Sequence, residues 1–531
     1  MARIVVAALV ALLLLAGPCH ARPAPQHAAA KSAAREKSSS VDGITAIYNF
    51  GDSLSDTGNL LREGDATGVL QHTTSLPYGS AIGGATGRCS DGYLMIDFLA
   101  KDLGLPLLNP YLDKGADFAH GVNFAVAGAT ALDAAALARK GVVVPHTNTS
   151  LGVQLQQFKD FMTANTRSPQ EIREKLARSL VMVGEIGGND YNYAFSANKP
   201  AAGGAHNLYN FGRVATAVVE AVALVPDVVR SVTDAAREVL DMGATRVVIP
   251  GNFPLGCVPS YMAAANETDP AAYDANGCLA ALNLFSQMHN VLLQQGIREL
   301  RRDYSGATIA YADYFYAYVR MLRDAGKTGF DEAAVTKACC GAGGGAYNVD
   351  MDRMCGAPGA EVCARPDEHI SWDGVHLTQR AYRVMTDLLY HKGFASPAPV
   401  EFQQLDLEKS GKCTSQDGGY GAALDNSVPP GQEEGLDDFH LAFKEESKHT
   451  RKDMLETSKL DRQLMTFLLE KGSSWEMEDV PPKVLHIMNK TAEGGKIQGW
   501  VNQQLKVGEG LEDCNATSHG SSELKACFRF E

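Results

Sequence analysis

The stretch Ile47-Tyr-Asn-Phe-Gly-Asp-Ser-Leu-Ser-Asp-Thr-Gly-Asn59 joins an apolar run to a polar segment at Gly51-Asp-Ser53. Residues 44–50 are rich in β-branched and aromatic side chains, which predicts a buried strand. Gly51 lets the backbone turn sharply at the end of this strand. We therefore expect Ser53 at the carboxyl edge of a strand, where open α/β sheets hold their ligands.

The residues that follow Ser53 favour the start of a helix. Ser55 and Asp56 are good helix-capping residues. They place the Ser53 amide close to a helix N-terminus, whose partial positive charge favours a bound oxyanion. Gly-Asp-Ser is also a common turn composition, so this stretch alone does not identify a nucleophile.

Working outward, short apolar runs alternate with helical patterns along the next 350 or so residues. The expected further strands cover residues 121–128, 180–183, 246–250 and 307–312. The expected helices cover residues 94–103, 153–162, 170–178, 207–242, 277–302, 314–325 and 377–392. Pro226 is expected to bend or divide the fourth of these helices. Strands that alternate with helices predict a layered α/β domain with a largely parallel sheet.

The N-terminus has the features of a secretory signal. A positive start, an apolar run over residues 4–16 and small residues before Ala21 predict a signal peptide over residues 1–21. Residues 22–43, rich in Ala, Pro, Lys and Ser, predict a flexible lead-in. The apolar run is too short for a membrane span, so we expect a secreted protein without stable membrane insertion.

Composition and charge narrow the classes of function. The 531 residues are 45% hydrophobic and 21% charged, as in an ordinary globular protein. The formal net charge of −14 and the absence of a dense Lys/Arg run argue against a nucleic-acid partner. Nothing in the composition indicates an oligomeric state.

The chain has 11 cysteines, of which Cys19 belongs to the signal. The others would enter an oxidising compartment, where disulfides are expected. The group of cysteines between 339 and 363 lacks a paired Cys-x-x-Cys, so we expect no zinc site. Glycosylation patterns begin at Asn148, Asn266, Asn489 and Asn515.

Asp373 and His376 stand three residues apart, just before a helix that Thr378 is expected to cap. The carboxylate can accept a hydrogen bond from one imidazole nitrogen, which leaves the other as a general base. A serine hydroxyl needs such a base to become a nucleophile. By itself, the pattern favours a structural interpretation, in which a surface aspartate caps a turn and the histidine is half-buried.

Two further residues offer donors for an oxyanion. Gly128 has a backbone N–H at the end of one expected strand, and Asn189 has a side-chain amide at the end of another. A turn glycine and a structural loop asparagine are the alternative interpretations.

Together, four segments resemble in order the blocks of the GDSL esterase/lipase family, or SGNH hydrolases. They are Gly51-Asp-Ser-Leu54, Gly121-x-Asn-Phe-Ala-x-x-Gly128, Gly187-Gly-Asn-Asp190 and Asp373-Gly-x-His376. Gly87-Arg-Cys-Ser-Asp-Gly92 and Cys339-Cys-Gly341 are additional matches to the plant branch of the family.

The resemblance implies a flavodoxin-like three-layer α/β/α sandwich over residues 44–395 and hydrolysis of acyl or acetyl esters without a metal or organic cofactor. It implies Ser53 as nucleophile, His376 as base and Asp373 as orienting carboxylate. The oxyanion would bind the amides of Ser53 and Gly128 and the Asn189 side chain. Substrates would be esters of small molecules or cell-wall polysaccharides, and the location extracellular or in the cell wall.

The segment Asn123-Phe-Ala-Val-Ala-Gly-Ala-Thr130 is similar to a subgroup that includes esterases of acetylated polysaccharides and of choline or phenolic esters. Family resemblance also implies a Cys257–Cys278 disulfide, pairing among the four cysteines between 339 and 363 in an order that cannot be read, and an unpaired Cys89.

Residues 396–531 continue beyond the usual end of the family and are polar and acid-rich. A disordered appendage, a small docking module and a segment joined by an erroneous gene model remain open for this poorly structured extension. For the domain itself, the alternative to an enzyme is a secreted carbohydrate- or protein-binding module that kept the fold and lost the chemistry. Such a module would be expected to have lost Ser53, Asn189, Asp373 or His376, and all four are present.

Overall fold

The computed structural model describes residues 41–64, 68–197 and 214–402. The predicted signal over residues 1–21, most of the lead-in over 22–43 and most of the extension over 396–531 lie outside the described residues. These three boundaries therefore stay predictions.

A six-stranded sheet forms the centre of the described residues, with the strand order β2-β1-β3-β4-β5-β8. In this sheet β1 to β5 are parallel to one another, and β8 pairs antiparallel with β5. The strands are β1 (Ala46–Gly51), β2 (Gly121–Asn123), β3 (Ser179–Glu185), β4 (Arg246–Pro250), β5 (Thr308–Ala312) and β8 (Ala395–Ser396). The order β2-β1-β3 makes the carboxyl ends of β1 and β3 a topological switch point, where ligands bind in open α/β sheets.

Alternate residues of each central strand enter different hydrophobic cores, because successive side chains of a strand point to opposite faces. Tyr48 and Val181 pack in one core, whereas Ile47 and Leu180 pack in the other. Both faces of the sheet are thus covered, which explains why these strands read as continuous apolar runs.

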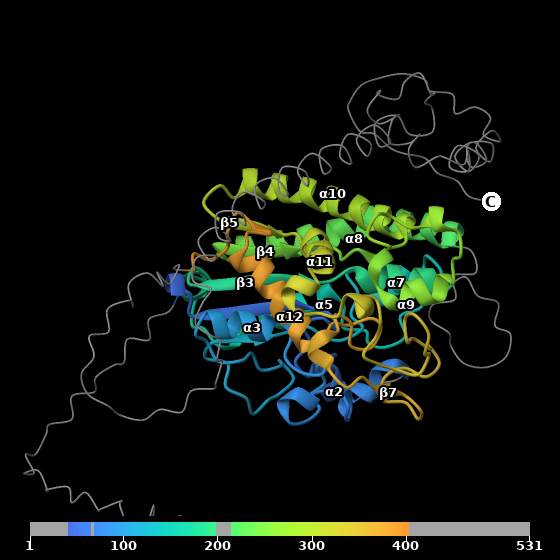
Figure 1. Ribbon diagram of the computed structural model, residues 1–531. Coiled ribbons are helices and arrows are strands. Elements are labelled where there is room, and N and C mark those ends of the chain that lie inside the picture. The colour runs from blue at the N-terminus through green and yellow to red at the C-terminus, as the bar shows by residue number, and fades with distance from the viewer. Residues whose placement is uncertain (1–40, 65–67, 198–213, 403–531) are drawn as a thin grey trace, which may run out of the picture. The chain divides into compact units, whose positions relative to one another are not determined.

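Helices cover both faces of the sheet (Figure 1). Helices α5, α8 and α10 contribute to the core that contains Tyr48, and α3, α11 and α12 to the core that contains Ile47. The helices are α2 (Asn59–Glu63), α3 (Met95–Asp102), α4 (Ala134–Ala138), α5 (Leu151–Ala164), α6 (Pro169–Leu176), α7 (Gly188–Ala197), α8 (Val214–Asp241), α9 (Pro259–Ala265), α10 (Ala280–Asp303), α11 (Tyr314–Arg323) and α12 (Gln379–Thr386). A small two-stranded sheet joins β6 (Cys340–Gly341) to β7 (Glu361–Val362).

The predicted α/β class with a mostly parallel central sheet is confirmed. The cap of α12 is as expected, since the Thr378 hydroxyl accepts a hydrogen bond from the Ala381 amide. Pro226 does not divide its helix, because α8 continues through it as one element; the first residues of the predicted helix, 207–213, lie outside the described residues. Within the described ranges, no helix combines the length and hydrophobicity that a membrane crossing demands.

Candidate active site

Ser53 lies in a turn directly after β1. The carbonyl of Asp52 accepts hydrogen bonds from the amides of Ser55 and Asp56, which closes this turn. The expected helix starts later, at Asn59, so the Ser53 amide does not lie at a helix N-terminus. The Asp56 carboxylate does bind the amides at the start of α2, but the intervening turn separates them from Ser53.

A side chain of helix α5 holds the end of β1. The Gln154 side chain, on α5, accepts a hydrogen bond from the Gly51 amide (2.9 Å) and donates one to the Gly51 carbonyl (2.8 Å). Gln154 is fully buried, so these backbone groups have a protein partner in place of water. The Gln154 amide therefore binds β1 immediately before the turn that carries Ser53.

Ser53, His376 and Asp373 form a hydrogen-bonded chain, although 323 residues separate the first two in sequence. His376 Nδ1 lies 2.7 Å from Asp373 Oδ2, and His376 Nε2 lies 2.8 Å from Ser53 Oγ. An ionised carboxylate only accepts, so Nδ1 carries the proton and Nε2 accepts from the serine hydroxyl. All three side chains are buried to more than nine-tenths.

Asp373 has four donors around its carboxylate. Oδ1 accepts from the amides of Val375 and His376, at 3.0 and 2.8 Å. Oδ2 accepts from His376 and from the Tyr78 hydroxyl, which lies 2.8 Å away. Burial alone would raise the pKa of Asp373, but the adjacent imidazole and the donors outweigh burial and lower the pKa to about 2. Asp373 is therefore ionised at neutral pH.

The same contact acts in the opposite direction on the histidine. Burial opposes protonation of His376, but the Asp373 carboxylate, with a further contribution from the neighbouring Cys89, outweighs burial and raises the pKa of the imidazole above its usual 6.5. A carboxylate in this position makes the imidazole a stronger base toward Ser53.

The structure places the two predicted oxyanion donors differently. Asn189, at the start of α7, lines the same cavity as Ser53 and His376. Its Nδ2 donates to the Ala129 carbonyl (2.9 Å) and lies 3.4 Å from Asp52 Oδ2. Gly128 has φ of +84°, which suits glycine, but it is not among the residues that line this cavity. The roles of both donors stay predictions.

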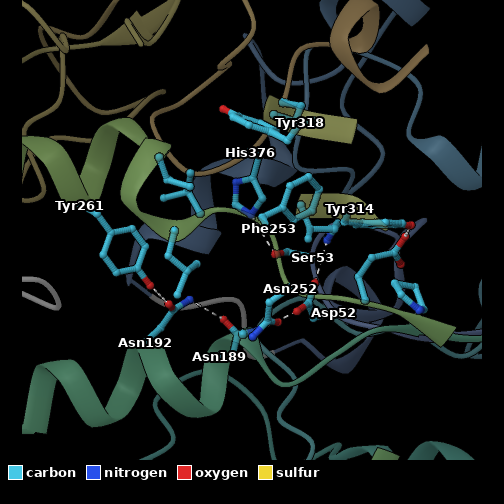
Figure 2. A pocket seen from close by; sticks show the side chains of 18 of the residues that line it. Asp52, Ser53, Asn189, Asn192, Asn252, Phe253, Tyr261, Tyr314, Tyr318 and His376 are labelled. Atoms are coloured by element: carbon cyan, nitrogen blue, oxygen red, sulfur yellow. Dashed lines mark hydrogen bonds between the residues drawn. The ribbon is translucent and has the colours of Figure 1, made fainter. Parts of the chain in front are cut away.

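A cavity opens in front of Ser53 (Figure 2). Most of its other wall residues are aromatic or aliphatic, and further polar side chains come from Asp52, Glu185, Asn192, Asn252 and Ser371. The aromatic members are Phe253, Tyr261, Tyr314 and Tyr318. A mostly apolar pocket with a few polar groups beside a reactive hydroxyl is the usual form of a small-molecule site.

Four residues at the site were not predicted from the sequence. Tyr78 and Asn192 contact the predicted residues Asp373 and Asn189, whereas Gln154 contacts Gly51 and Tyr261 contacts Asn192. The sequence did mark Gln154, because this polar residue lies among the apolar positions of α5, next to Leu155. In the structure its side chain is fully buried. No comparable signal marks Tyr78, whose partner Asp373 is 295 residues away.

Three disulfides lie in the described part of the chain. The implied Cys257–Cys278 bond is present. The pairing of the four cysteines between 339 and 363, which the sequence left open, is Cys339–Cys363 and Cys340–Cys355. Cys89 is buried and forms no disulfide. Cys339, Cys363 and His369 come close enough together to suggest a metal site, but the two sulfurs are bonded to each other.

A mostly parallel sheet between two layers of helices, with a hydrogen-bonded serine, histidine and aspartate at its switch point, is an arrangement typical of hydrolases. The chain belongs to the family described as GDSL-like lipase/acylhydrolase, whose model matches residues 47–389. The chain is therefore a carboxylic ester hydrolase by family, as the resemblance implied.

Named relatives agree with this membership. Acetylajmalan esterase 1 of Rauvolfia serpentina is 42% identical over 344 residues, which are 65% of this chain and 85% of that protein. A second acetylajmalan esterase of the same plant is 42% identical over 338 residues, or 64% and 82%. A GDSL esterase/lipase of Arabidopsis thaliana is 39% identical over 358 residues, or 67% and 88%.

Proposed function

We propose that the protein is a secreted serine esterase in which Ser53 is the nucleophile, His376 the general base and then acid, and Asp373 the orienting carboxylate. The observation that carries the proposal is the unbroken hydrogen-bonded chain from Asp373 through His376 to the Ser53 hydroxyl. A serine hydroxyl becomes an effective nucleophile when such a base removes its proton.

In the proposed course, His376 accepts the Ser53 proton while Oγ attacks the ester carbonyl. The imidazolium then protonates the leaving alcohol, and an acyl-enzyme remains. Water, deprotonated by His376, releases the carboxylic acid and restores Ser53. The amides of Ser53 and Gly128 and the Asn189 side chain would stabilise the oxyanion of both tetrahedral intermediates.

The cavity and the relatives together favour an ester with a small acyl group. The names of the two Rauvolfia serpentina relatives specify acetyl ester hydrolysis by those proteins. Here the aromatic walls beside Ser53 suit a larger, largely apolar alcohol portion. A screen of purified protein against acetylated phenolics, phenolic choline esters, acetylated xylan and acyl esters of graded length measures this preference directly.

Secretion is part of the proposal, supported by the signal-like residues 1–21 and by three disulfides in the described residues. N-terminal sequencing of protein recovered from a plant cell-wall fraction or culture medium would check it. We expect the mature chain to begin after Ala21, and retention of full-length protein inside cells would contradict secretion.

The catalytic assignment is tested with Ser53→Ala. We expect this variant to lose turnover of a short-chain chromogenic ester and to escape labelling by a fluorophosphonate probe, with an unchanged melting temperature. Normal activity of the variant would refute the assignment. A wild-type protein that neither hydrolyses the screened esters nor reacts with the probe would favour a binding module on the same fold.

A further inference from the structure

The Asn189 side chain is held at both ends of its carboxamide. Its Nδ2 donates to the Ala129 carbonyl at 2.9 Å and, over a longer distance, to Asp52 Oδ2 at 3.4 Å, and its Oδ1 accepts from Nδ2 of Asn192 at 3.2 Å. If the amide turned over, its oxygen would face the Ala129 carbonyl and its nitrogen would face another nitrogen. The two contacts therefore fix which end of Asn189 presents N–H groups.

Asn192 is fixed in turn by a tyrosine from a different helix. The Tyr261 hydroxyl, on α9, donates to Asn192 Oδ1 on α7. This contact orients the Asn192 amide so that its nitrogen faces Asn189. Figure 2 shows the three side chains in a row; of the three, Asn189 lies nearest to Ser53 and Tyr261 farthest away.

All donors in this row point the same way, from Tyr261 through Asn192 and Asn189 to the Ala129 carbonyl. Hydrogen bonds in a chain of one direction polarise one another, so each one strengthens the next donor. Tyr261 is 2% exposed and packs edge-on against Phe195, with the ring centroids 6.1 Å apart. Its position is therefore set by the core.

The geometry points to Tyr261 and Asn192 as positioning residues that orient and polarise the Asn189 amide toward the oxyanion. This inference rests on the proposed function, because it assumes that Asn189 binds the oxyanion. Neither residue needs to touch the reacting atoms for this effect. Their contribution should appear mainly in kcat, since an oxyanion donor is most effective in the transition state.

A double-mutant cycle between Tyr261→Phe and Asn189→Ala tests the inference, with kcat and KM measured on one chromogenic ester for all four proteins. We expect Asn189→Ala to lower kcat about 100-fold or more. Tyr261→Phe should lower kcat roughly threefold to tenfold, with KM little changed. In the Asn189→Ala background the same Tyr261→Phe change should have almost no further effect.

Tyr318→Phe is the matched control, because it removes a hydroxyl from the same cavity wall without touching the Tyr261–Asn192–Asn189 row. Whatever its effect on kcat, that effect should be the same with and without Asn189. Asn192→Ala cuts the row at its second link and should reproduce the coupling seen with Tyr261→Phe. Melting temperatures show that each variant is folded.

The outcomes separate the two claims. If Asn189→Ala lowers kcat strongly but Tyr261→Phe and Asn192→Ala act equally in both backgrounds, the positioning role is wrong and the proposed function stands. If Asn189→Ala leaves kcat unchanged, Asn189 is not an oxyanion donor, and the positioning role fails with it. Ser53→Ala, tested separately, decides whether the serine mechanism itself holds.

Discussion

Two buried aspartates belong to the surroundings of Ser53: Asp52 precedes it in the chain, and Asp373 is linked to it through His376. Their surroundings shift their pKa values in opposite directions. Asp373 accepts hydrogen bonds from two amides, from Tyr78 and from His376, and its pKa falls to about 2. Asp52 accepts one from the Leu54 amide and a longer one from the Asn189 side chain (3.4 Å), and it lies near the carboxyl groups of Glu185 and Asp190. Burial, together with these acidic neighbours, raises the pKa of Asp52 to about 8.

The difference shows that burial does not by itself decide the charge of a carboxyl group. Removal from water disfavours the ionised form of both aspartates. Asp373 remains ionised because donors and a basic ring surround it, whereas Asp52 keeps its proton at neutral pH. Only the first can hold an imidazolium, so the two aspartates are chemically distinct despite their similar burial.

The largest effect is expected for Asp373→Asn. An amide in this position cannot stabilise the imidazolium and favours the wrong tautomer of His376, so kcat should fall on the order of 10³- to 10⁴-fold. The same substitution at the other aspartate, Asp52→Asn, is the matched control. It replaces a neutral group with a neutral group of similar shape and should change kcat by less than about tenfold. Equal losses in the two variants would contradict the contrast.

Tyr78→Phe should weaken the support of the ionised aspartate. The variant removes a buried hydroxyl that donates to a charged carboxylate, so the free energy of unfolding at pH 7 should fall by roughly 1.5–3 kcal/mol. Urea denaturation of wild type and variant measures the loss. In the Asp373→Asn background, Tyr78→Phe should lower the free energy of unfolding by less. An equal loss in both backgrounds would show that the charge of Asp373 does not strengthen the Tyr78 hydrogen bond.

The pH profile of the wild-type enzyme should show the raised pKa of His376. The neutral imidazole is the active base, so kcat/KM should rise with pH as His376 loses its proton. Because the Asp373 carboxylate raises that pKa, the midpoint of the acid limb should lie above pH 6.5. Residual activity of Asp373→Asn should have its midpoint at lower pH. A wild-type midpoint at or below 6.5 would argue against an ionised Asp373.

The smallest effect is a trend in stability with pH. Asp52 keeps its proton in the folded state up to about pH 8, whereas an unfolded aspartate loses it near pH 4. The folded state binds more protons between these values, so Asp52 makes stability fall as pH rises from about 4 to 8. Asp52→Asn removes this dependence. Its melting temperature relative to wild type should therefore increase steadily between pH 5 and 8, and a constant difference would contradict the raised pKa.

Local patterns predicted much of the fold. The limits of β4 agree with the expected strand over residues 246–250, because a buried parallel strand is a continuous apolar run in any context. The predicted start of the helix after Ser53 was wrong, because α2 begins only at Asn59. Asp56 binds the first amides of this helix from a position in the preceding turn. Propensity identifies a capping residue but does not fix how far the chain extends before the helix begins.

The candidate site was predictable only in part. Ser53, Asn189, Asp373 and His376 were predicted from ordered motifs. In the structure Ser53, Asn189 and His376 line one cavity, and Asp373 contacts His376. The supporting residues were not found, because a buried tyrosine such as Tyr78 looks like any other core aromatic in sequence. Their function depends on contacts between distant segments, and only the folded chain shows which segments meet.

The loop that carries Asp373 and His376 is backed by the disulfide-bonded segment around β6. The amides of Cys339 and Cys340 donate to the carbonyls of Ser371 and Trp372, immediately before Asp373, and both cysteines are disulfide-bonded. Loss of a native disulfide commonly costs about 2–5 kcal/mol. Recombinant protein made in a reducing cytosol would therefore lack the disulfides that hold this segment against the loop of Asp373 and His376. An oxidising host is the appropriate choice for producing the enzyme.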